Sequence, residues 1–176
     1  TRVRQWLENQ AKFFFSTPRG FWHRSTSFLA EGRIVKGLWV GCGDDNTDEG
    51  VLLYIHGGAF IFGSPTTHMK LAARIAGDLN FKAALPDYRL APEHKYPDAL
   101  IDVITTYKAI LGNGIPSNQI ILAGDSAGGT LVLQLLNYIL KEQLDIPSAA
   151  ILLSPLTDLT FSSNSILENE KEEVIL

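Results

Sequence analysis

The sequence predicts an α/β fold in which a mostly parallel β-sheet is flanked by helices. One observation is a set of short, almost continuously apolar segments, which are typical of strands buried on both faces. A second is that segments with apolar residues at helical spacing lie between them. The alternation of the two kinds implies a parallel sheet covered on both faces, with right-handed crossovers. With 176 residues and 45% apolar content, the chain can bury one sizeable core.

The individual elements follow from these patterns. A strand is expected at 33–40, ahead of a turn rich in Gly, Asp and Asn at 41–50. The four buried strands are expected at 51–55, 81–85, 120–123 and 149–153. The three helices are expected around 71–79, 100–111 and 127–144. The last helix is apolar nearly all round, which places it in the centre of the fold.

The segment 1–30 is expected to be a helical cap that precedes an α/β core at 31–176. Apolar residues recur at helical spacing near its start, and an aromatic pair follows at Phe21 and Trp22. The spaced residues are Val3, Trp6, Leu7, Ala11 and Phe14. Two interpretations stay open: this segment packs on the main domain, or it forms part of a cap over an apolar substrate pocket.

Composition excludes several function classes. A net charge of −4, with scattered Lys and Arg, gives no basic surface for nucleic acid. No apolar run is long enough to span a bilayer. The single cysteine, Cys42, excludes an internal disulfide, and no metal-ligand cluster is apparent, so neither metal nor cofactor is expected. The compartment stays open, although one cysteine and no N-glycosylation acceptor site favour an intracellular protein. Oligomeric state is not indicated.

The motif Gly124-Asp125-Ser126-Ala127-Gly128 carries the main chemical signal. It has the pattern G-x-S-x-G, and it stands directly after a predicted strand and directly before a predicted helix. A nucleophile on such a turn needs small neighbours, and the helix behind it directs backbone N–H groups at developing negative charge. Ser126 is therefore the candidate nucleophile.

A second motif, His56-Gly57-Gly58-Ala59-Phe60, follows the expected strand 51–55. Small residues there let backbone amides approach the oxygen of a substrate carbonyl, which becomes an oxyanion during acyl transfer. The candidate donors are the N–H groups of Gly57, Gly58 and Ala127. His56 is expected to brace this glycine loop rather than act as the general base, and Asp125 is expected to be a local hydrogen-bond acceptor.

At this point the chain resembles the hormone-sensitive-lipase-like family of α/β-hydrolases, which includes bacterial esterases and arylacetamide deacetylase. The resemblance covers about residues 30–160. The blocks that carry it are 56–60, 87–94 with 96–99, 124–129 and, more weakly, 154–160. It implies an α/β-hydrolase fold and a serine esterase or lipase that needs no cofactor.

The block that begins Asp87-Tyr88-Arg89 is the one most specific to this family, and its role is expected to be architectural. An ion pair between Arg89 and Glu93 is expected to hold the loop beneath the site, with Pro92 and Pro97 fixing its turns.

The rest of the catalytic triad is absent from this sequence. In α/β-hydrolases the order along the chain is Ser, then Asp or Glu, then His. No histidine follows Ser126. Asp158 belongs to the block 154–160, which precedes the place of the triad acid in the family, so it is not assigned that role. The chain is therefore expected to be the N-terminal part of a hydrolase, truncated at its C-terminal side and inactive by itself.

Three hypotheses about the function remain. The leading one is that the full-length parent hydrolyses small apolar carboxylic esters through an acyl-enzyme on Ser126. The second is a non-catalytic ligand-binding protein on the same scaffold, because the family also resembles the gibberellin receptors of plants. The third is an inactive truncated fragment. The identity of the acyl and alcohol groups is not indicated by the sequence.

Overall fold

The computed structural model describes residues 16–43 and 50–160, together with the single positions 6, 9, 162, 164 and 168. These residues form a six-stranded sheet with the order β1-β2-β4-β3-β5-β6. The strands are β1 (Phe21–Ala30), β2 (Arg33–Cys42), β3 (Val51–Ile55), β4 (Lys82–Pro86), β5 (Ile120–Asp125) and β6 (Ala149–Leu153). The helices are α2 (Pro65–Asp78), α3 (Asp98–Gly112), α4 (Ala127–Lys141) and a short 3₁₀ turn, η1 (Ser117–Gln119).

The sheet is mixed, with a parallel part and an antiparallel part. Strands β4, β3, β5 and β6 run parallel to one another. The hairpin of β1 and β2 joins them through the antiparallel pair β2–β4. This arrangement confirms the predicted mostly parallel sheet, and each expected strand is present within a few residues of its predicted bounds.

Residues 21–30 correct the predicted helical cap. They form β1, a strand that pairs with β2 along its whole length. A two-residue turn, Glu31 and Gly32, joins the two strands with φ values of 51° and 74°, as a type I′ hairpin turn requires. The aromatic pair Phe21 and Trp22 therefore belongs to the sheet. The predicted helix from Val3 to Phe14 lies outside the described residues, apart from Trp6 and Asn9.

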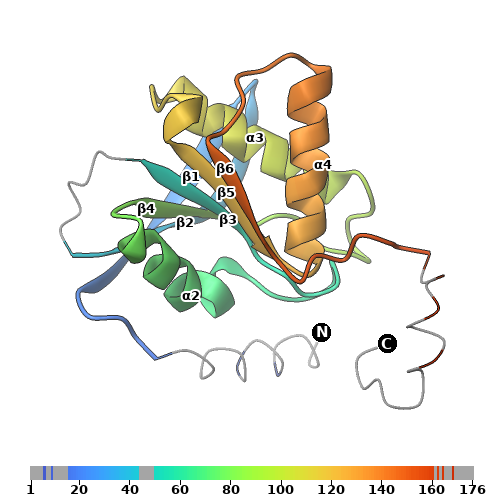
Figure 1. Cartoon of the computed structure of the whole chain (residues 1–176), viewed down its shortest axis with the longest axis horizontal. Coiled ribbons are helices and arrows are strands. Elements are labelled where there is room, and N and C mark those ends of the chain that lie inside the picture. The colour runs from blue at the N-terminus through green and yellow to red at the C-terminus, as the bar shows by residue number, and fades with distance from the viewer. Residues whose placement is uncertain are drawn as a thin grey trace.

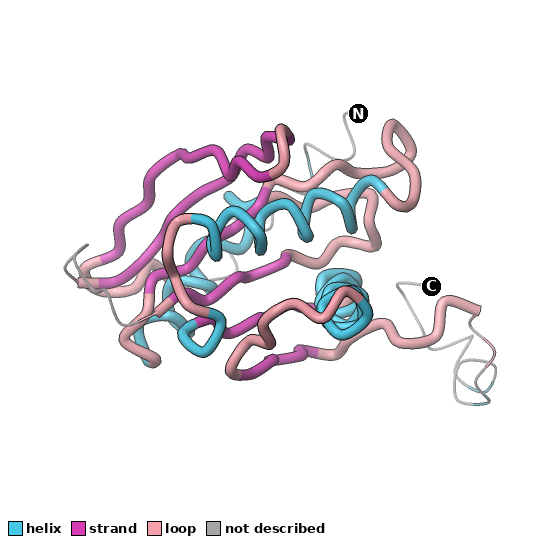
Figure 2. The backbone as a smooth tube through the Cα atoms, turned by 90° about the horizontal axis from the view of Figure 1, so that it is seen from above, coloured by secondary structure: helices cyan, strands magenta, loops and turns pink. Residues whose placement is uncertain are grey.

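The helices cover both faces of the sheet (Figure 1). Helix α2 lies on one face, and α3 and α4 lie on the other. Seen from above, α4 is end-on while α3 runs across the view, so these two helices cross at a large angle (Figure 2). In the parts of the chain that the structure describes, no helix is both long and apolar enough to cross a membrane.

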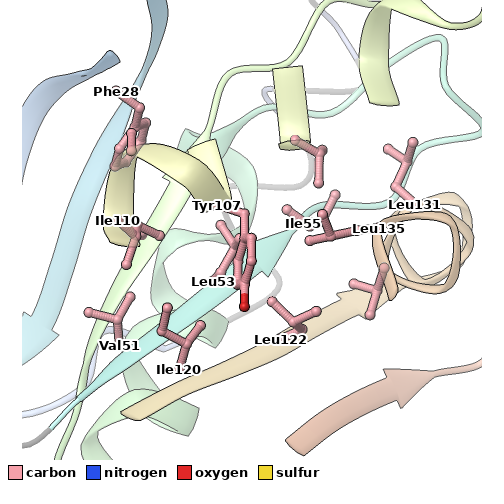
Figure 3. Close-up of a cluster of buried hydrophobic side chains, with 14 of the residues drawn as sticks. Phe28, Val51, Leu53, Ile55, Tyr107, Ile110, Ile120, Leu122, Leu131 and Leu135 are labelled. Atoms are coloured by element: carbon pink, nitrogen blue, oxygen red, sulfur yellow. The ribbon is translucent and has the colours of Figure 1, made fainter. Parts of the chain in front are cut away.

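Two apolar clusters fill the spaces between these layers. The larger one lies between the sheet and the pair α3 and α4, and Figure 3 shows its central side chains. Leu53, Ile55 and Leu122 enter it from the central strands, and Leu131 and Leu135 enter it from α4. The smaller cluster packs three alanines of α2 against the opposite face of the sheet. The alternating side chains of β3 supply both clusters, which is why this strand is apolar throughout.

Candidate active site

Two adjacent parallel strands place the two predicted motifs beside each other. Strands β3 and β5 pair in a register that sets Ile55 against Gly124. The chain leaves β3 into the glycine loop, defined here as residues 56–63, and it leaves β5 into Ser126. Open α/β sheets bind their ligands at this carboxyl edge of the strands.

Ser126 lies on a tight turn between β5 and α4. Its φ and ψ are 49° and −121°, and it is the N-cap residue of α4. Its side chain is exposed, and no described residue is hydrogen-bonded to its hydroxyl group. This strained strand-to-helix turn is the geometry of a nucleophile elbow.

The glycines around Ser126 are required by close backbone contacts. A Cβ atom at Gly124 would lie 2.6 Å from the carbonyl carbon of Gly128. A Cβ atom at Gly128 would collide with the carbonyl oxygen of Ile55 and would lie 2.6 Å from that of His56. These contacts also bring the start of the glycine loop directly against the elbow.

The last residue of β6 and the segment after it hold the elbow from the other side. The N–H group of Ser126 donates to the carbonyl of Leu153 at 2.9 Å, and the carbonyl of Ser126 accepts from the N–H group of Leu156 at 3.2 Å. The fourth block of the family resemblance, residues 154–160, is therefore part of the site's framework.

The glycine loop has a backbone that few residues can adopt. Gly58 has φ of +123°, and the next two residues, Ala59 and Phe60, also have positive φ. The carbonyl of Gly58 accepts hydrogen bonds from the N–H groups of Ile61 and Phe62. This folds the loop back on itself.

The three candidate oxyanion donors differ in whether their N–H groups already have an acceptor. The N–H group of Gly57 donates to Oδ1 of Asp125 at 3.0 Å, so it is already occupied. The N–H group of Ala127 belongs to the first residue of α4, where no intrahelical acceptor exists. No described residue accepts a hydrogen bond from the N–H group of Gly58. Gly58 and Ala127 are therefore the two of these candidates whose N–H groups have no acceptor among the described residues.

Asp125 connects the glycine loop, the sheet and α2. Besides the Gly57 amide, it accepts from the hydroxyl of Tyr54 at 2.9 Å, and its Oδ2 lies 3.5 Å from Nε2 of His68. Burial raises the pKa of this carboxyl group, but the hydrogen bonds and the nearby His68 more than offset it, so the pKa lies below its ordinary value. Asp125 is a hydrogen-bond acceptor, as expected from the sequence.

His56 is fully enclosed under the glycine loop. Its Nδ1 lies 2.9 Å from the carbonyl oxygen of Gly57, and its ring stacks on Tyr88 with centroids 4.2 Å apart. Burial lowers the pKa of His56 to about 3. A neutral imidazole whose Nδ1 contacts the Gly57 carbonyl supports the loop.

The block that begins at Asp87 fastens the glycine loop to the rest of the domain. The hydroxyl of Tyr88 donates to the carbonyl of His56 at 2.7 Å, and the N–H group of Ala91 donates to the carbonyl of Phe60 at 2.9 Å. Both hydrogen bonds are consistent with the expected architectural role of this block.

The carboxylates bound by Arg89 are different from the one predicted. The guanidinium group binds Asp102 at 2.8 Å and Asp98 at 3.1 Å, rather than the predicted Glu93, which is exposed. Asp98 and Asp102 lie one turn apart on α3 and present two acceptors to a planar fork. The pairing of Arg89 with Asp98 and Asp102 was not predicted from the sequence, because it depends on the residue at which α3 begins.

Asp158 has a local role. Its carboxylate accepts hydrogen bonds from the N–H and hydroxyl groups of Thr160 and of Ser162. The bonds from Thr160 and then Ser162 lower the pKa of Asp158 to about 2. In the described ranges, no group of three or more His, Cys, Asp or Glu side chains could hold a metal ion.

A family model described as the α/β-hydrolase fold matches residues 52–176. The chain belongs to the α/β-hydrolase family. This α/β-hydrolase chain is 42% identical over 127 residues to an esterase of Acinetobacter venetianus, an alignment that covers 72% of the chain and 42% of the esterase. It is 35% identical over 130 residues to an acetyl-hydrolase of Streptomyces hygroscopicus, covering 73% and 43% of the two chains. The chain thus spans less than half the length of these relatives.

Solved structures agree with the family assignment. The hormone-sensitive-lipase homologue EstE7, from a metagenome library, superposes with a TM-score of 0.86 at 32% identity, covering 98% of this chain and 57% of EstE7. EstE5, in a crystal soaked with p-nitrophenyl butyrate, gives a TM-score of 0.83 at 30% identity, covering 98% and 56% of the two chains. The α/β-hydrolase chain is therefore of the hormone-sensitive-lipase-like type.

Sequence reasoning missed several side chains that hold this α/β-hydrolase site together. Tyr54 and His68 contact Asp125, and Tyr88 contacts His56. Tyr88 lies within a block that the resemblance had singled out. Nothing in the local pattern of Tyr54 or His68 signals a contact with Asp125.

Proposed function

We propose that the protein to which this chain belongs hydrolyses carboxylic esters through an acyl-enzyme on Ser126. The observation that carries the proposal is the exposed Ser126 on a strained turn, at the same edge of the sheet as the glycine loop. Relatives named esterase and acetyl-hydrolase support the same reaction class. They do not favour the alternative of a binding protein without activity.

The reaction follows from these groups. The Ser126 oxygen attacks the ester carbonyl carbon, and the hydroxyl proton passes to a general base. The carbonyl oxygen becomes an oxyanion that accepts hydrogen bonds from Gly58 and Ala127. The base returns the proton to the departing alcohol, which leaves an acyl group on Ser126. A water molecule then releases the acid and restores the serine.

The general base in this proposal lies outside the 176 residues. All four histidines of the chain precede Ser126, at positions 23, 56, 68 and 94. His56 is buried and neutral, and His68 is directed at Asp125. The order of triad residues in the family places the acid and the base after the nucleophile.

The first prediction concerns turnover of p-nitrophenyl butyrate by the longer protein that contains this chain. Ser126→Ala is expected to reduce kcat by about 10⁶-fold, because the covalent intermediate cannot form. The release of p-nitrophenol is followed by absorbance. Ser27→Ala, an exposed serine on β1, is the matched control and should leave kcat unchanged. Full turnover by Ser126→Ala, with an intact fold by circular dichroism, would show that another group is the nucleophile.

A further inference from the structure

His68, near the start of α2, contacts groups at both ends of the glycine loop. Its Nε2 lies 3.5 Å from Oδ2 of Asp125, and Asp125 accepts a hydrogen bond from the N–H group of Gly57, the second residue of the loop. Its Nδ1 lies 2.7 Å from Oγ1 of Thr67, which accepts from the N–H group of Ser64, the residue that follows the loop. One imidazole ring therefore connects the two ends of the loop.

The Asp125 carboxylate has His68 as the partner of its second oxygen. The Tyr54 hydroxyl and the Gly57 amide both donate to Oδ1, whereas the contact of Oδ2 among the described residues is with His68. The terminal torsion of an aspartate is soft, so a contact at each oxygen fixes its orientation better than two contacts at one oxygen. The carboxylate also lies directly against the loop, because a Cβ atom at Gly57 would collide with Oδ2.

The contacts of His68 indicate which ring nitrogen carries a proton. An ionised carboxylate can only accept hydrogen bonds, so the nitrogen that faces Asp125, Nε2, is the one that needs the proton. The hydroxyl of Thr67 can donate or accept, so it suits Nδ1 with or without a proton.

We propose that His68 is a positioning residue for the glycine loop: the N–H group at its Nε2 holds the Asp125 carboxylate against the Gly57 amide. The consequence for catalysis rests on the proposed function. Gly58, the next residue, is a candidate oxyanion donor with φ of +123°, and the direction of its N–H group depends on where Gly57 is held. Donors to an oxyanion act mainly in the transition state, so loss of His68 should lower kcat more than it raises KM.

A packing role for the His68 ring is the alternative to this proposal. The ring stacks on His56 with centroids 5.6 Å apart, and its centroid lies 6.2 Å from that of Tyr54. His68→Phe keeps a flat ring but has no N–H donor. His68→Gln loses the ring but keeps an amide donor that extends about as far as Nε2. The two variants therefore separate donation from packing.

The first measurement is hydrogen exchange at the Gly57 amide of the 176-residue chain, relative to exchange at Leu53 in the central strand β3. In His68→Phe the Gly57 amide is expected to exchange about tenfold faster, which corresponds to one hydrogen bond to a charged group. His68→Gln should retain the slow exchange. His23→Phe, at an exposed position on β1, is the control and should leave the ratio unchanged.

The second measurement is nitrogen-15 NMR of the imidazole in the unmodified chain, which does not depend on the folding of a variant. Nε2 of His68 is expected to carry a proton at every pH at which the chain is folded. A protonated Nδ1 with a bare Nε2 would overturn the proposal.

The third measurement is turnover of p-nitrophenyl butyrate by the longer protein that contains this chain. His68→Phe is expected to lower kcat about tenfold, less than the roughly 10²- to 10³-fold cost of removing an oxyanion donor outright, with KM nearly unchanged. His68→Gln should restore most of kcat.

The outcomes distinguish this proposal from the proposed function. Exchange at Gly57 that is no faster in His68→Phe than in His68→Gln would show that the ring packs rather than donates, and would overturn the positioning role. Turnover by Ser126→Ala would refute the proposed function instead, and the exchange and nitrogen measurements would still decide the role of His68.

Discussion

His56 is the first residue of the glycine loop, and it is only 1% exposed. Its Nδ1 contacts the Gly57 carbonyl, while its Nε2 is buried without a partner among the described residues. Burial in this place disfavours the imidazolium form and accounts for the lowered pKa. The folded protein therefore resists protonation of His56 in a pH range where the unfolded chain accepts the proton.

This difference predicts a pH dependence of stability. The pKa of His56 falls from an ordinary 6.5 to about 3 in the folded protein. Its contribution is therefore neutral above pH 6.5, and stability is lost as the pH falls from 6.5 towards 3, with a limiting slope of about 1.4 kcal/mol per pH unit. The depressed pKa of Asp125 acts in the same direction but only below its ordinary value of 3.8. Urea unfolding between pH 7 and 5 isolates the histidine.

The control for this measurement is a pair of variants. His56→Asn removes the titrating group and should flatten the slope of unfolding free energy between pH 7 and 5. His23→Asn, on an exposed position of β1, should retain it. An unchanged slope in His56→Asn would contradict the conclusion that the buried imidazole of His56 stays neutral in the folded protein.

Individual residues also show which features of the site could be predicted from the sequence and which could not. The position of Ser126 on a strand-to-helix turn could be predicted because its signal is local, a serine between glycines that follows an apolar run and precedes a helical pattern. The occupation of the Gly57 amide by Asp125 could not, because it depends on the distance between two loops. The same holds for the contact of His68 with Asp125.

Among the elements, β1 is the one that was assigned wrongly from the sequence. Strand β1 mixes apolar and polar residues, and most of them are exposed or half-buried, which is a weaker signal than the continuous apolar runs of β3 and β5. The aromatic pair Phe21 and Trp22 was assigned to the preceding helical pattern. The two-residue turn with Gly32 was the available signal, because both of its residues need positive φ. The parallel strands were predictable because their apolar runs are continuous. Helix α3 was predictable because apolar residues recur along it at helical spacing.

The hairpin turn yields a prediction at this scale. Gly32 has φ of +74° with nothing within 4 Å of an added Cβ, so Gly32→Ala is limited by backbone strain alone. It should lower the unfolding free energy by about 1–2 kcal/mol. Gly112, the last residue of α3, also has open space but no positive φ, and Gly112→Ala should raise stability by about 0.5 kcal/mol. Chemical denaturation measures both. Equal effects of the two variants would contradict the turn assignment.

At the scale of the whole molecule, the Ser126 turn and the glycine loop lie on one edge of the sheet, at the ends of the paired strands β5 and β3. The hydrogen bond from the Gly57 amide to Asp125 links the glycine loop to the Ser126 turn, and bonds from Tyr88 and Ala91 fasten the loop to the rest of the domain. Strand β6 borders the described sheet and pairs only with β5 among the described strands. An edge with exposed apolar side chains such as Leu153 is a surface that further strands can cover.

The most direct test of Ser126 as the nucleophile is labelling with a fluorophosphonate, read by peptide mass spectrometry. The longer protein that contains this chain should be labelled stoichiometrically at Ser126, and its Ser126→Ala variant should remain unlabelled. The 176-residue chain by itself should react no faster than free serine, because an unassisted hydroxyl is a weak nucleophile and its histidines all precede Ser126. Labelling of the longer protein at a different residue, or rapid labelling of the 176-residue chain at Ser126, would contradict the account.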